Sequence, residues 1–367
     1  MTTTPSPAAC QVAVYYFPNW HPSPRNNNYY GLGENEWKAV KAAQPRFPGH
    51  QQPKVPAWGY EDEALPDVMA KKISAAADHA IDAFIFDWYW YDDMGPMLHE
   101  ALEQAFLPAP NNNRLKFGVM WANHSPVTRA TFEAAVNHCI ESYFNHPACW
   151  RVDGKPYFSI YEFHTLMKGL GGPAGTRAAL DYLRQRAQAA GLPGVHLNAV
   201  EWGLQQLPGK FAQDRRAFLA YMGIDSVTSY VWIHNPVLPE FPANPYPAVA
   251  ERAAGYWERF TTEFATAYHP NVTMGWDSWP RVPLTEPFQP GAYPALPLLT
   301  NNTPESFRQA LLSARAFVEN HPTSQGIITI NAWNEWTEGS YLEPDTTHGL
   351  GYLEAIRDVF RPIGPGA

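Results

Sequence analysis

The chain lacks the features on which several classes of protein depend. Its 367 residues include only three cysteines, Cys10, Cys139 and Cys149, so no disulfide framework is expected, and no C-x-x-C motif offers a zinc or redox site. No apolar run approaches the roughly 18 residues of a membrane-spanning helix, so no membrane span is expected. Charged residues make up only 17% of the chain and the net charge is −9. This balance argues against nucleic acid as a partner, because an acidic protein repels phosphate.

Motifs of cofactor-dependent enzymes are missing too. No G-x-G-x-x-G follows a strand-like run and no G-x-x-x-x-G-K-[ST] occurs, so we expect no nucleotide-binding sheet and no cofactor. The H-E-x-x-H motif and an H-x-H pair on an early strand are also absent. A metal-dependent barrel hydrolase remains an alternative, because four possible ligands lie near predicted strand ends: His124, His164, His234 and Asp277.

The N-terminus, MTTTPSPAAC, has neither the basic start nor the apolar segment of a secretory signal. We therefore expect a cytoplasmic protein if the chain is native and complete, and a periplasmic or secreted one if a signal peptide has been removed. Residues 1–10 are expected to form a flexible tail.

The chain is rich in residues that build a core. Hydrophobic residues make up 45% of the chain and aromatic residues 14%, which excludes a disordered protein. Eight runs rich in β-branched and aromatic residues indicate strands, and segments with helical apolar spacing separate them. The alternation predicts an α/β protein with a single (β/α)8 TIM barrel over residues 1–367. The predicted strands are 12–17, 83–90, 116–124, 156–163, 195–201, 226–232, 272–279 and 326–336. The predicted helices are 65–80, 98–106, 128–144, 174–190, 210–222, 248–268, 304–320 and 354–360.

Proline is abundant and unevenly placed. The 36 prolines are about twice the average usage. Many lie in three long connections, 18–62, 234–247 and 280–304, and each of these follows a predicted strand and precedes a predicted helix. In a barrel such connections lie on the C-terminal face, where active sites occur. The distribution favours a cleft built up on that face, although stiff surface loops would also explain it.

The predicted strand ends repeat one pattern, a carboxylate or amide beside a large aromatic residue. Six of the eight ends carry tryptophan. Aromatic rings stack on the apolar faces of sugars, and Asp, Glu and Asn side chains bind hydroxyl groups, so the pattern suits a neutral carbohydrate. Packing in the barrel core would account for any single tryptophan.

The densest chemistry lies at the end of the eighth predicted strand, where Glu335 and Glu338 are three residues apart. On a helical turn their side chains would share a face, with Cβ atoms about 5–6 Å apart. Two carboxylates at that distance separate in pKa, and one stays protonated near neutrality. This is the acid/base pair that glycoside cleavage needs. A turn-capping role for Glu338 is the structural alternative.

The segment Trp333-Asn-Glu-Trp-Thr-Glu-Gly-Ser-Tyr-Leu-Glu-Pro-Asp345 resembles the signature of the family 99-like glycoside hydrolases. These include the endo-α-mannosidases and the WbsX-like proteins of polysaccharide gene clusters. Further landmarks follow in order: residues 13–21, 33–37, 51–53, 81–84, 121–123 and 275–277, and Pro280-Arg281. The resemblance implies a (β/α)8 barrel without a catalytic metal. It also implies that Glu338 is the general acid/base, and that Glu335 acts on the sugar 2-hydroxyl, giving retention through a 1,2-anhydro intermediate.

One departure bears on the substrate. Thr337 stands where endo-α-mannosidases usually have His, and residues 340–344 are closer to the WbsX-like branch, so a mannoside is less firmly implied than a glycoside. We predict a retaining hydrolase, endo-acting on an α-linked, mannoside-like oligo- or polysaccharide. A polysaccharide-cluster glycosyltransferase or transglycosylase is the alternative, followed by a non-catalytic carbohydrate-binding protein.

Further residues of the long loops and strand ends are predicted to bind the substrate. Asp345, in the same segment, either joins them or caps the last helix. The predicted binding residues are His21, Glu34, Glu36, Trp37, Asp87, Trp121, Asn123, Tyr161, Glu201, Tyr230, Trp232, Trp276, Asp277, Asn334, Trp336, Tyr341 and Glu343.

Overall fold

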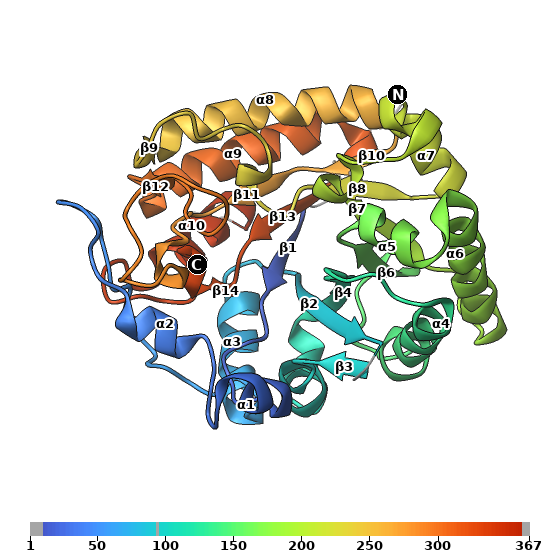
Figure 1. Cartoon of the computed structure of the whole chain (residues 1–367), viewed down its shortest axis with the longest axis horizontal. Coiled ribbons are helices and arrows are strands. Elements are labelled where there is room, and N and C mark those ends of the chain that lie inside the picture. Colours follow the sequence, from blue (N-terminus) through green and yellow to red (C-terminus); the bar gives the residue numbers. More distant parts are fainter. Residues whose placement is uncertain (1–9, 93–94, 362–367) are drawn as a thin grey trace, which may run out of the picture.

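A ring of parallel strands forms the centre of the molecule (Figure 1). The computed structural model describes residues 10–92 and 95–361, so residues 1–9 of the predicted tail lie outside the described part. The order of neighbours in the ring is β10-β8-β7-β6-β4-β2-β1-β13-β11. The ring strands are β1 (Gln11–Tyr16), β2 (Ala83–Tyr91), β4 (Lys116–Trp121), β6 (Lys155–Ile160), β7 (His196–Val200), β8 (Ser226–Thr228), β10 (Ala267–His269), β11 (Asn271–Thr273) and β13 (Ile327–Asn331).

The seventh strand position is shared by two short segments. β10 pairs with β8 and β11 pairs with β13, and only Pro270 separates the two segments along the chain. Proline cannot donate to a strand ladder, which accounts for the break. The two segments together bring the ring nearly to closure, and the predicted α/β barrel is confirmed.

Helices surround the ring, and the long α8 and α9 contact each other along one side (Figure 1). Thr303 caps α9 by accepting a hydrogen bond from the backbone of Ser306, with Pro304 in the first turn, as the sequence favours. The helices are α1 (Pro24–Tyr30), α2 (Trp37–Ala42), α3 (Pro66–Asp78), α4 (Arg129–His138), α5 (Phe163–Gly169), α6 (Gly172–Ala189), α7 (Arg215–Met222), α8 (Tyr246–Phe264), α9 (Pro304–Asn320) and α10 (Gly351–Phe360). Among the described residues, none of the helices combines the length and the apolar content needed to cross a membrane.

Shorter elements complete the described part. The π-helical segments η1 (Ala101–Phe106) and η3 (Cys139–Phe144) cover the predicted helix 98–106 and the end of 128–144. The 3-10 turns are η2 (Asn112–Arg114), η4 (Glu201–Leu204), η5 (Gly209–Gln213), η6 (Trp232–His234), η7 (Trp279–Arg281), η8 (Pro322–Ser324) and η9 (Trp336–Glu338). The remaining strands are β3 (Gly95–Met97), β5 (Arg151–Val152), β9 (Ala243–Pro245), β12 (Leu298–Thr300), β14 (Asn334–Glu335) and β15 (Ser340–Tyr341).

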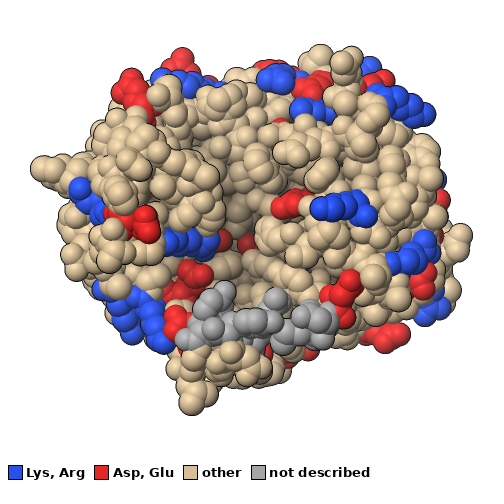
Figure 2. Space-filling model, in the orientation of Figure 1, with Lys and Arg blue, Asp and Glu red and all other residues tan. Residues whose placement is uncertain are grey.

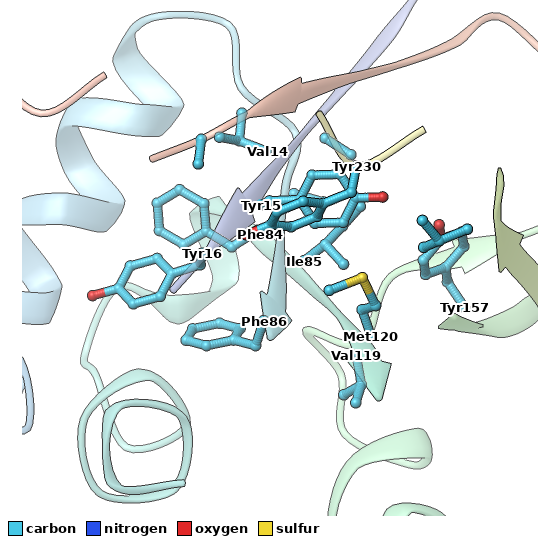
Figure 3. Packing of buried hydrophobic residues seen from close by; sticks show 14 of the residues in the cluster. Val14, Tyr15, Tyr16, Phe84, Ile85, Phe86, Val119, Met120, Tyr157 and Tyr230 are labelled. Carbon is cyan, nitrogen blue, oxygen red and sulfur yellow. The ribbon is translucent and has the colours of Figure 1, made fainter. Parts of the chain in front are cut away.

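Side chains of the first strand alternate between the two sides of the ring (Figure 3). Tyr15 points inward, with its ring centroid 4.7 Å from that of Tyr230. Tyr16 points outward and contacts Phe86 at 4.7 Å, and Phe86 in turn contacts Phe106 of η1. Because side chains alternate along a strand and both faces are covered, β1 is buried after its first residue.

Several predicted boundaries were wrong at the C-terminal ends of strands. The predicted strand 116–124 ends at Trp121, 156–163 ends at Ile160, 226–232 ends at Thr228 and 326–336 ends at Asn331. The predicted helix 248–268 ends at Phe264, because residues 267–269 pair with β8, and the seventh strand position therefore starts and ends earlier than 272–279. Buried residues continue beyond each of these strands, and after β6, β8 and β13 they include aromatic residues, which explains the overlong predictions.

The three proline-rich connections join one another on one side. β9, from the second connection, pairs in parallel with β12, from the third. A small apolar cluster around Trp279, Val282 and Leu298 also holds Phe47 of the first connection and Phe241 of the second. The cluster links all three long loops, and each of them also places residues near the site described below.

Candidate active site

A cavity of about 630 Å³ lies at the C-terminal ends of the barrel strands, and Figure 2 shows a hollow near the centre of the face turned to the viewer. Every strand position of the ring contributes to its wall through a residue at or just beyond the strand end. The lining residues are Phe17, Asp87, Tyr89, Met120, Ala122, His124, Tyr161, Glu162, Trp202, Tyr230, Val231, Ile233, His234, Trp276, Arg281, Tyr293, Leu296, Glu335 and Glu338.

Glu335 and Glu338 lie on one tight turn in this wall. Glu335 ends β14, and the 3-10 turn η9 carries Glu338 at its last position. Residues i and i+3 eclipse in a 3-10 turn, so the two carboxyl groups face the same side. Gly339 ends the turn with φ of 63°, and a Cβ there would lie 2.8 Å from that of Asp277. Glycine is therefore required at this position by both its conformation and its surroundings.

Buried hydrogen bonds hold this segment in place. The side chain of Asn334 accepts a hydrogen bond from the backbone N–H of Phe17 and donates one to its carbonyl, both at 2.8 Å. Glu343 accepts hydrogen bonds from the indole nitrogens of Trp333 at 3.0 Å and Trp336 at 2.7 Å. Lys72, on α3, lies 2.8 Å from Glu343. The turn that carries the carboxyl pair is therefore held by buried hydrogen bonds and by the ion pair of Glu343 with Lys72.

One guanidinium contacts both carboxyl groups. Nη2 of Arg281 lies 3.2 Å from Oε2 of Glu335, and Nη1 lies 3.1 Å from Oε1 of Glu338. Nε of Arg281 contacts the Thr337 hydroxyl at 2.9 Å and lies 3.7 Å from Oε2 of Glu36. Arginine presents several donors in a planar fork, so this one side chain fixes both carboxylates at once.

Burial raises the pKa of both carboxyl groups. For Glu335, whose pKa lies well above the usual value, the negative charge of Glu338 adds to burial, and Arg281 acts in the opposite direction. For Glu338 burial again raises the pKa, while Arg281 and the Tyr293 hydroxyl favour the ionised form. Two interacting carboxyl groups with raised pKa values titrate as a pair, and the pair retains a proton more readily than free glutamates do.

Asp87 and Tyr230 extend the polar network below the pair. The Tyr230 hydroxyl lies 2.9 Å from Oδ2 of Asp87 and 3.1 Å from Oε1 of Glu335. Asp87 is only 3% exposed. Burial holds the pKa of Asp87 well above its usual value. The hydrogen bond from Tyr230 lowers this pKa, and the negative charge of Glu338 raises it further.

Aromatic residues form another part of the cavity wall. Trp202 is 37% exposed and stacks on His234, with ring centroids 4.7 Å apart. Nε2 of His234 contacts the hydroxyl of Tyr161 at 3.1 Å. Burial lowers the pKa of His234 to about 3, so this ring is neutral at physiological pH. These residues offer flat, uncharged rings in the same cavity as the carboxyl pair.

With this geometry described, comparison with known proteins places the chain in a family. The family model described as Glycosyltransferase WbsX matches residues 12–130 and 127–356. The chain belongs to the WbsX family. The WbsX chain is also 28% identical over 377 residues to a protein of Xanthomonas campestris pv. campestris (strain B100) named "Uncharacterized protein WxcX". That match covers 98% of this chain and 50% of the relative, so the chain spans about half the length of the curated relatives it matches.

Solved structures show the same fold as this WbsX chain. The GH99 endo-alpha-mannosidase from Bacteroides thetaiotaomicron matches with a TM-score of 0.63 at 15% identity, covering 95% of this chain and 96% of that one. A structure titled "Glycoside hydrolase-like protein" also matches with a TM-score of 0.63 at 15% identity, covering 98% and 97%. The predicted resemblance to the family 99-like proteins, with a WbsX relationship, is confirmed.

The structure of the WbsX chain brings some of the predicted site residues together. Asp87, Tyr161, Tyr230 and Trp276 line the cavity with the carboxyl pair. Glu36 reaches the cluster through Arg281. Glu34, by contrast, forms an ion pair with Lys38 near the surface.

Other predicted binding residues do not line the cavity. Trp121 packs outside the ring against Trp88 and Phe132. Trp232 donates its indole N–H to the carbonyl of Asn271. The Asn123 side chain bonds to the backbone of Glu162. Because alternate residues leave a strand on opposite faces, an error of one position reverses the direction of a side chain.

A second group of predicted binding residues supports the carboxyl turn from behind. Trp37 packs against Trp20 and Trp336, and Trp336 stacks on Tyr341 with ring centroids 3.7 Å apart. Asn334 and Glu343 make the contacts described above. Asp345 accepts a hydrogen bond from the Tyr341 hydroxyl and from backbone N–H groups of the turn that follows, whereas α10 begins later, at Gly351.

The remaining three predicted residues are satisfied by other side chains. His21 lies between Glu63 and Glu100, at 3.3 and 3.1 Å. Glu201 is buried and accepts hydrogen bonds from Gln205. Asp277 contacts His50 at 2.8 Å and Gln52 at 2.7 Å, beside a separate cavity of about 130 Å³.

Sequence reasoning gave no role to several cavity residues. In the sequence Arg281 belongs to a family landmark, and Tyr293 lies in the third proline-rich loop. Trp202, rather than its neighbour Glu201, faces the cavity. The sequence gives little indication that an arginine or a tyrosine in such a loop belongs to a site, because contacts among the loops decide where the side chain points.

The possible metal ligands of the alternative interpretation are dispersed. His124 contacts Glu162, His234 contacts Tyr161, and Asp277 contacts His50, while His164 is exposed on α5. Over residues 10–92 and 95–361, no group of three or more His, Cys, Asp or Glu side chains is placed to hold a metal ion.

Proposed function

We propose that this protein is a retaining glycoside hydrolase, endo-acting on an α-linked, mannoside-like oligo- or polysaccharide. The observation that carries the proposal is the Glu335/Glu338 pair on one turn, joined by Arg281, in the wall of a cavity lined by aromatic side chains. Most glycoside hydrolases cleave the glycosidic bond with a pair of carboxyl groups that lie in distinct surroundings.

In the proposed reaction, Glu338 donates its proton to the glycosidic oxygen as the bond from that oxygen to the anomeric carbon breaks. Glu335 takes the proton of the sugar 2-hydroxyl, whose oxygen forms a bond to the anomeric carbon and gives a 1,2-anhydro sugar. A water molecule then opens this ring at the anomeric carbon. Glu338 accepts a proton from the water and Glu335 returns a proton to the 2-oxygen. Two displacements at one carbon give net retention.

The electrostatics of the pair support a shared, exchangeable proton, and the assignment of Glu338 as the acid and Glu335 as the base follows from the resemblance to the family 99-like proteins. The raised pKa values mean that the pair can hold a proton in the range where an acid catalyst operates. Arg281 and the hydroxyls of Tyr293 and Tyr230 stabilise the ionised forms. The site thus offers both a proton donor and a base.

The cavity walls support a carbohydrate substrate. Trp202, His234 and Tyr161 present flat faces on which the apolar side of a sugar ring can stack. The structural likeness to an endo-alpha-mannosidase favours an α-linked substrate and endo action. Thr337, whose hydroxyl bonds to Arg281, stands where endo-α-mannosidases usually have His, so we describe the sugar as mannoside-like.

Glycosyl transfer is the second candidate, and the description of the matching family favours it. In the same chemistry a sugar hydroxyl would replace water in the second step. The active-site residues and their roles would be unchanged.

An array of defined α-linked glycans, incubated with the protein and analysed for products, tests the proposal. Hydrolysis predicts reducing-end fragments, and early NMR spectra should show the product hemiacetal with the anomeric configuration of the substrate. New, longer glycans would identify transfer instead. An inverted first product would refute the retaining mechanism, and cleavage that requires added zinc would favour the metal-dependent alternative.

A further inference from the structure

Tyr230 lies between two carboxyl groups that compete for its single proton. Its hydroxyl is within hydrogen-bond distance of both Asp87 Oδ2 and Glu335 Oε1. A phenol can donate only one hydrogen bond, so both contacts are hydrogen bonds only if one carboxyl group donates a proton to the phenol oxygen. With both groups ionised, two carboxylate oxygens would share one donor, and one buried oxygen would be left unpaired.

Asp87 is the carboxyl group better suited to hold that proton. Glu335 has Arg281 at 3.2 Å, whereas no Lys or Arg forms an ion pair with Asp87 among the described residues. The titratable groups around Asp87 are four tyrosines and the two glutamates of the carboxyl pair. The tyrosines come from β1, β2 and the ends of β6 and β8, and the full set is Tyr15, Tyr89, Tyr161, Tyr230, Glu335 and Glu338. A charge without a counter-ion is costly to bury, and neutralisation avoids that cost.

The second oxygen of Asp87 fits the same interpretation. Oδ1 is buried and has no hydrogen-bond partner in the part of the chain that the structure describes. An unpaired carbonyl oxygen of a neutral acid costs less than an unpaired oxygen of a carboxylate. Burial also raises the pKa of Asp87 well above its usual value.

We propose that Asp87 is a positioning residue that carries a proton in the resting protein and donates it in a hydrogen bond to Tyr230, so that the Tyr230 hydroxyl donates to Glu335. The inference rests on the proposed function only for its catalytic consequence. The directed chain from Asp87 through Tyr230 stabilises the ionised form of Glu335, which is the form that accepts the proton of the 2-hydroxyl. An ionised Asp87 would instead take the Tyr230 proton and repel the charge on Glu335.

Infrared spectroscopy of the full chain tests the protonation of Asp87 without a substrate. At neutral pH the wild type should show a carbonyl stretching band of a buried carboxylic acid. Asp87→Asn, which preserves shape and can donate from its amide nitrogen, should lose one component of that band. Asp358→Asn, at an aspartate whose side chain is 50% exposed, is the control and should leave the band unchanged. A band that Asp87→Asn leaves intact overturns the inference.

Kinetics test the positioning role once the glycan array has identified a substrate. Tyr230→Phe removes the hydrogen bond to ionised Glu335, so kcat should fall roughly 10- to 100-fold and the acidic limb of the kcat/KM profile should move to higher pH. Asp87→Leu removes the donor that orients the Tyr230 hydroxyl but leaves its hydrogen bond to Glu335, so kcat should fall by less than in Tyr230→Phe, and Asp87→Asn should restore most of the lost kcat. If Asp87 is ionised, Asp87→Asn removes a negative charge and moves the acidic limb to lower pH, which overturns the inference. If no glycan is cleaved, the proposed function fails while the infrared result still decides the state of Asp87.

Discussion

The hydroxyl of Tyr293 donates a 2.7 Å hydrogen bond to Oε1 of Glu338 from a position 45 residues earlier in the chain. Tyr293 lies in the third proline-rich loop and is 49% exposed, whereas Glu338 is 6% exposed. A surface loop therefore reaches into the cavity and sets the environment of the proposed acid. The same loop supplies Arg281, so two contacts of Glu338 depend on how this loop folds.

Tyr293→Phe should shift the pH profile in a defined direction. Its hydroxyl favours ionised Glu338, so its removal raises the pKa of that carboxyl group. The proposed reaction needs a proton on Glu338, and the basic limb of the kcat/KM profile reports the loss of that proton. The basic limb should therefore move to higher pH. Tyr221→Phe, outside the cavity, is the control, and an unmoved basic limb in Tyr293→Phe would contradict the assignment of Glu338.

Trp202→Ala should weaken substrate binding more than it slows the reaction. The exposed indole lines the cavity and stacks on His234, and Trp202 has no acidic or basic group, so it can contact a sugar but cannot transfer a proton. Loss of one aromatic stacking contact predicts a KM higher by roughly 3- to 10-fold, with a smaller change in kcat. Tyr221→Ala removes an equally exposed aromatic side chain, 37% in both cases, from outside the cavity. Equal effects of the two substitutions on KM would show that Trp202 does not contact the substrate.

The barrel and the carboxyl pair could be predicted from the sequence, because both depend on local patterns. Eight alternations of strand and helix identify the fold, and Glu335 and Glu338 are neighbours along the chain. The directions of strand-end side chains could not be predicted, since one residue decides whether Trp202 or Glu201 faces the cavity. Arg281 and Tyr293 depend on contacts among three loops, such as the cluster that joins Phe47 to Trp279, and no local pattern reports those contacts.

Lys72→Met should destabilise the fold strongly. The ammonium group of Lys72 is buried with Glu343 at 2.8 Å and Glu63 at 3.5 Å, so its removal leaves buried Glu343 without its cation and leaves Glu63 with His21 alone. Breaking a buried ion pair from one side costs about 3–5 kcal/mol. The free energy of unfolding in urea measures the loss. Lys71→Met is the matched control, because Lys71 is 38% exposed in its ion pair with Glu61 and should contribute about 0–1 kcal/mol. A similar, small loss for both variants would contradict the role of the buried cluster.

The stability of the fold should also depend on pH through His21. The hydrogen bonds and charges of Glu100 and Glu63 outweigh burial, which acts in the opposite direction, and raise the pKa of His21 from 6.5 to about 9. A pKa that is higher in the folded state gives stability that is fully present below pH 6.5 and is lost as the pH rises through about 9. The contribution is on the order of 3 kcal/mol.

Urea unfolding between pH 6 and pH 10 checks this dependence. His21→Gln should be less stable than the wild type at the acidic end, and the difference between the two proteins should shrink towards pH 10. A difference that stays constant over the range would mean that His21 is not charged in the folded protein.

The rate of the Glu338→Gln variant tests the central claim, that the carboxyl pair performs acid-assisted glycoside cleavage. The substitution preserves shape but leaves no proton to give to the leaving oxygen. The measurement is kcat on the cognate glycan, with Glu354→Gln on the exposed side of α10 as the control. We expect kcat to fall roughly 10²- to 10⁴-fold in Glu338→Gln, with folding intact, and to stay at the wild-type value in the control. A Glu338→Gln variant that turns over at close to the wild-type rate would contradict the account.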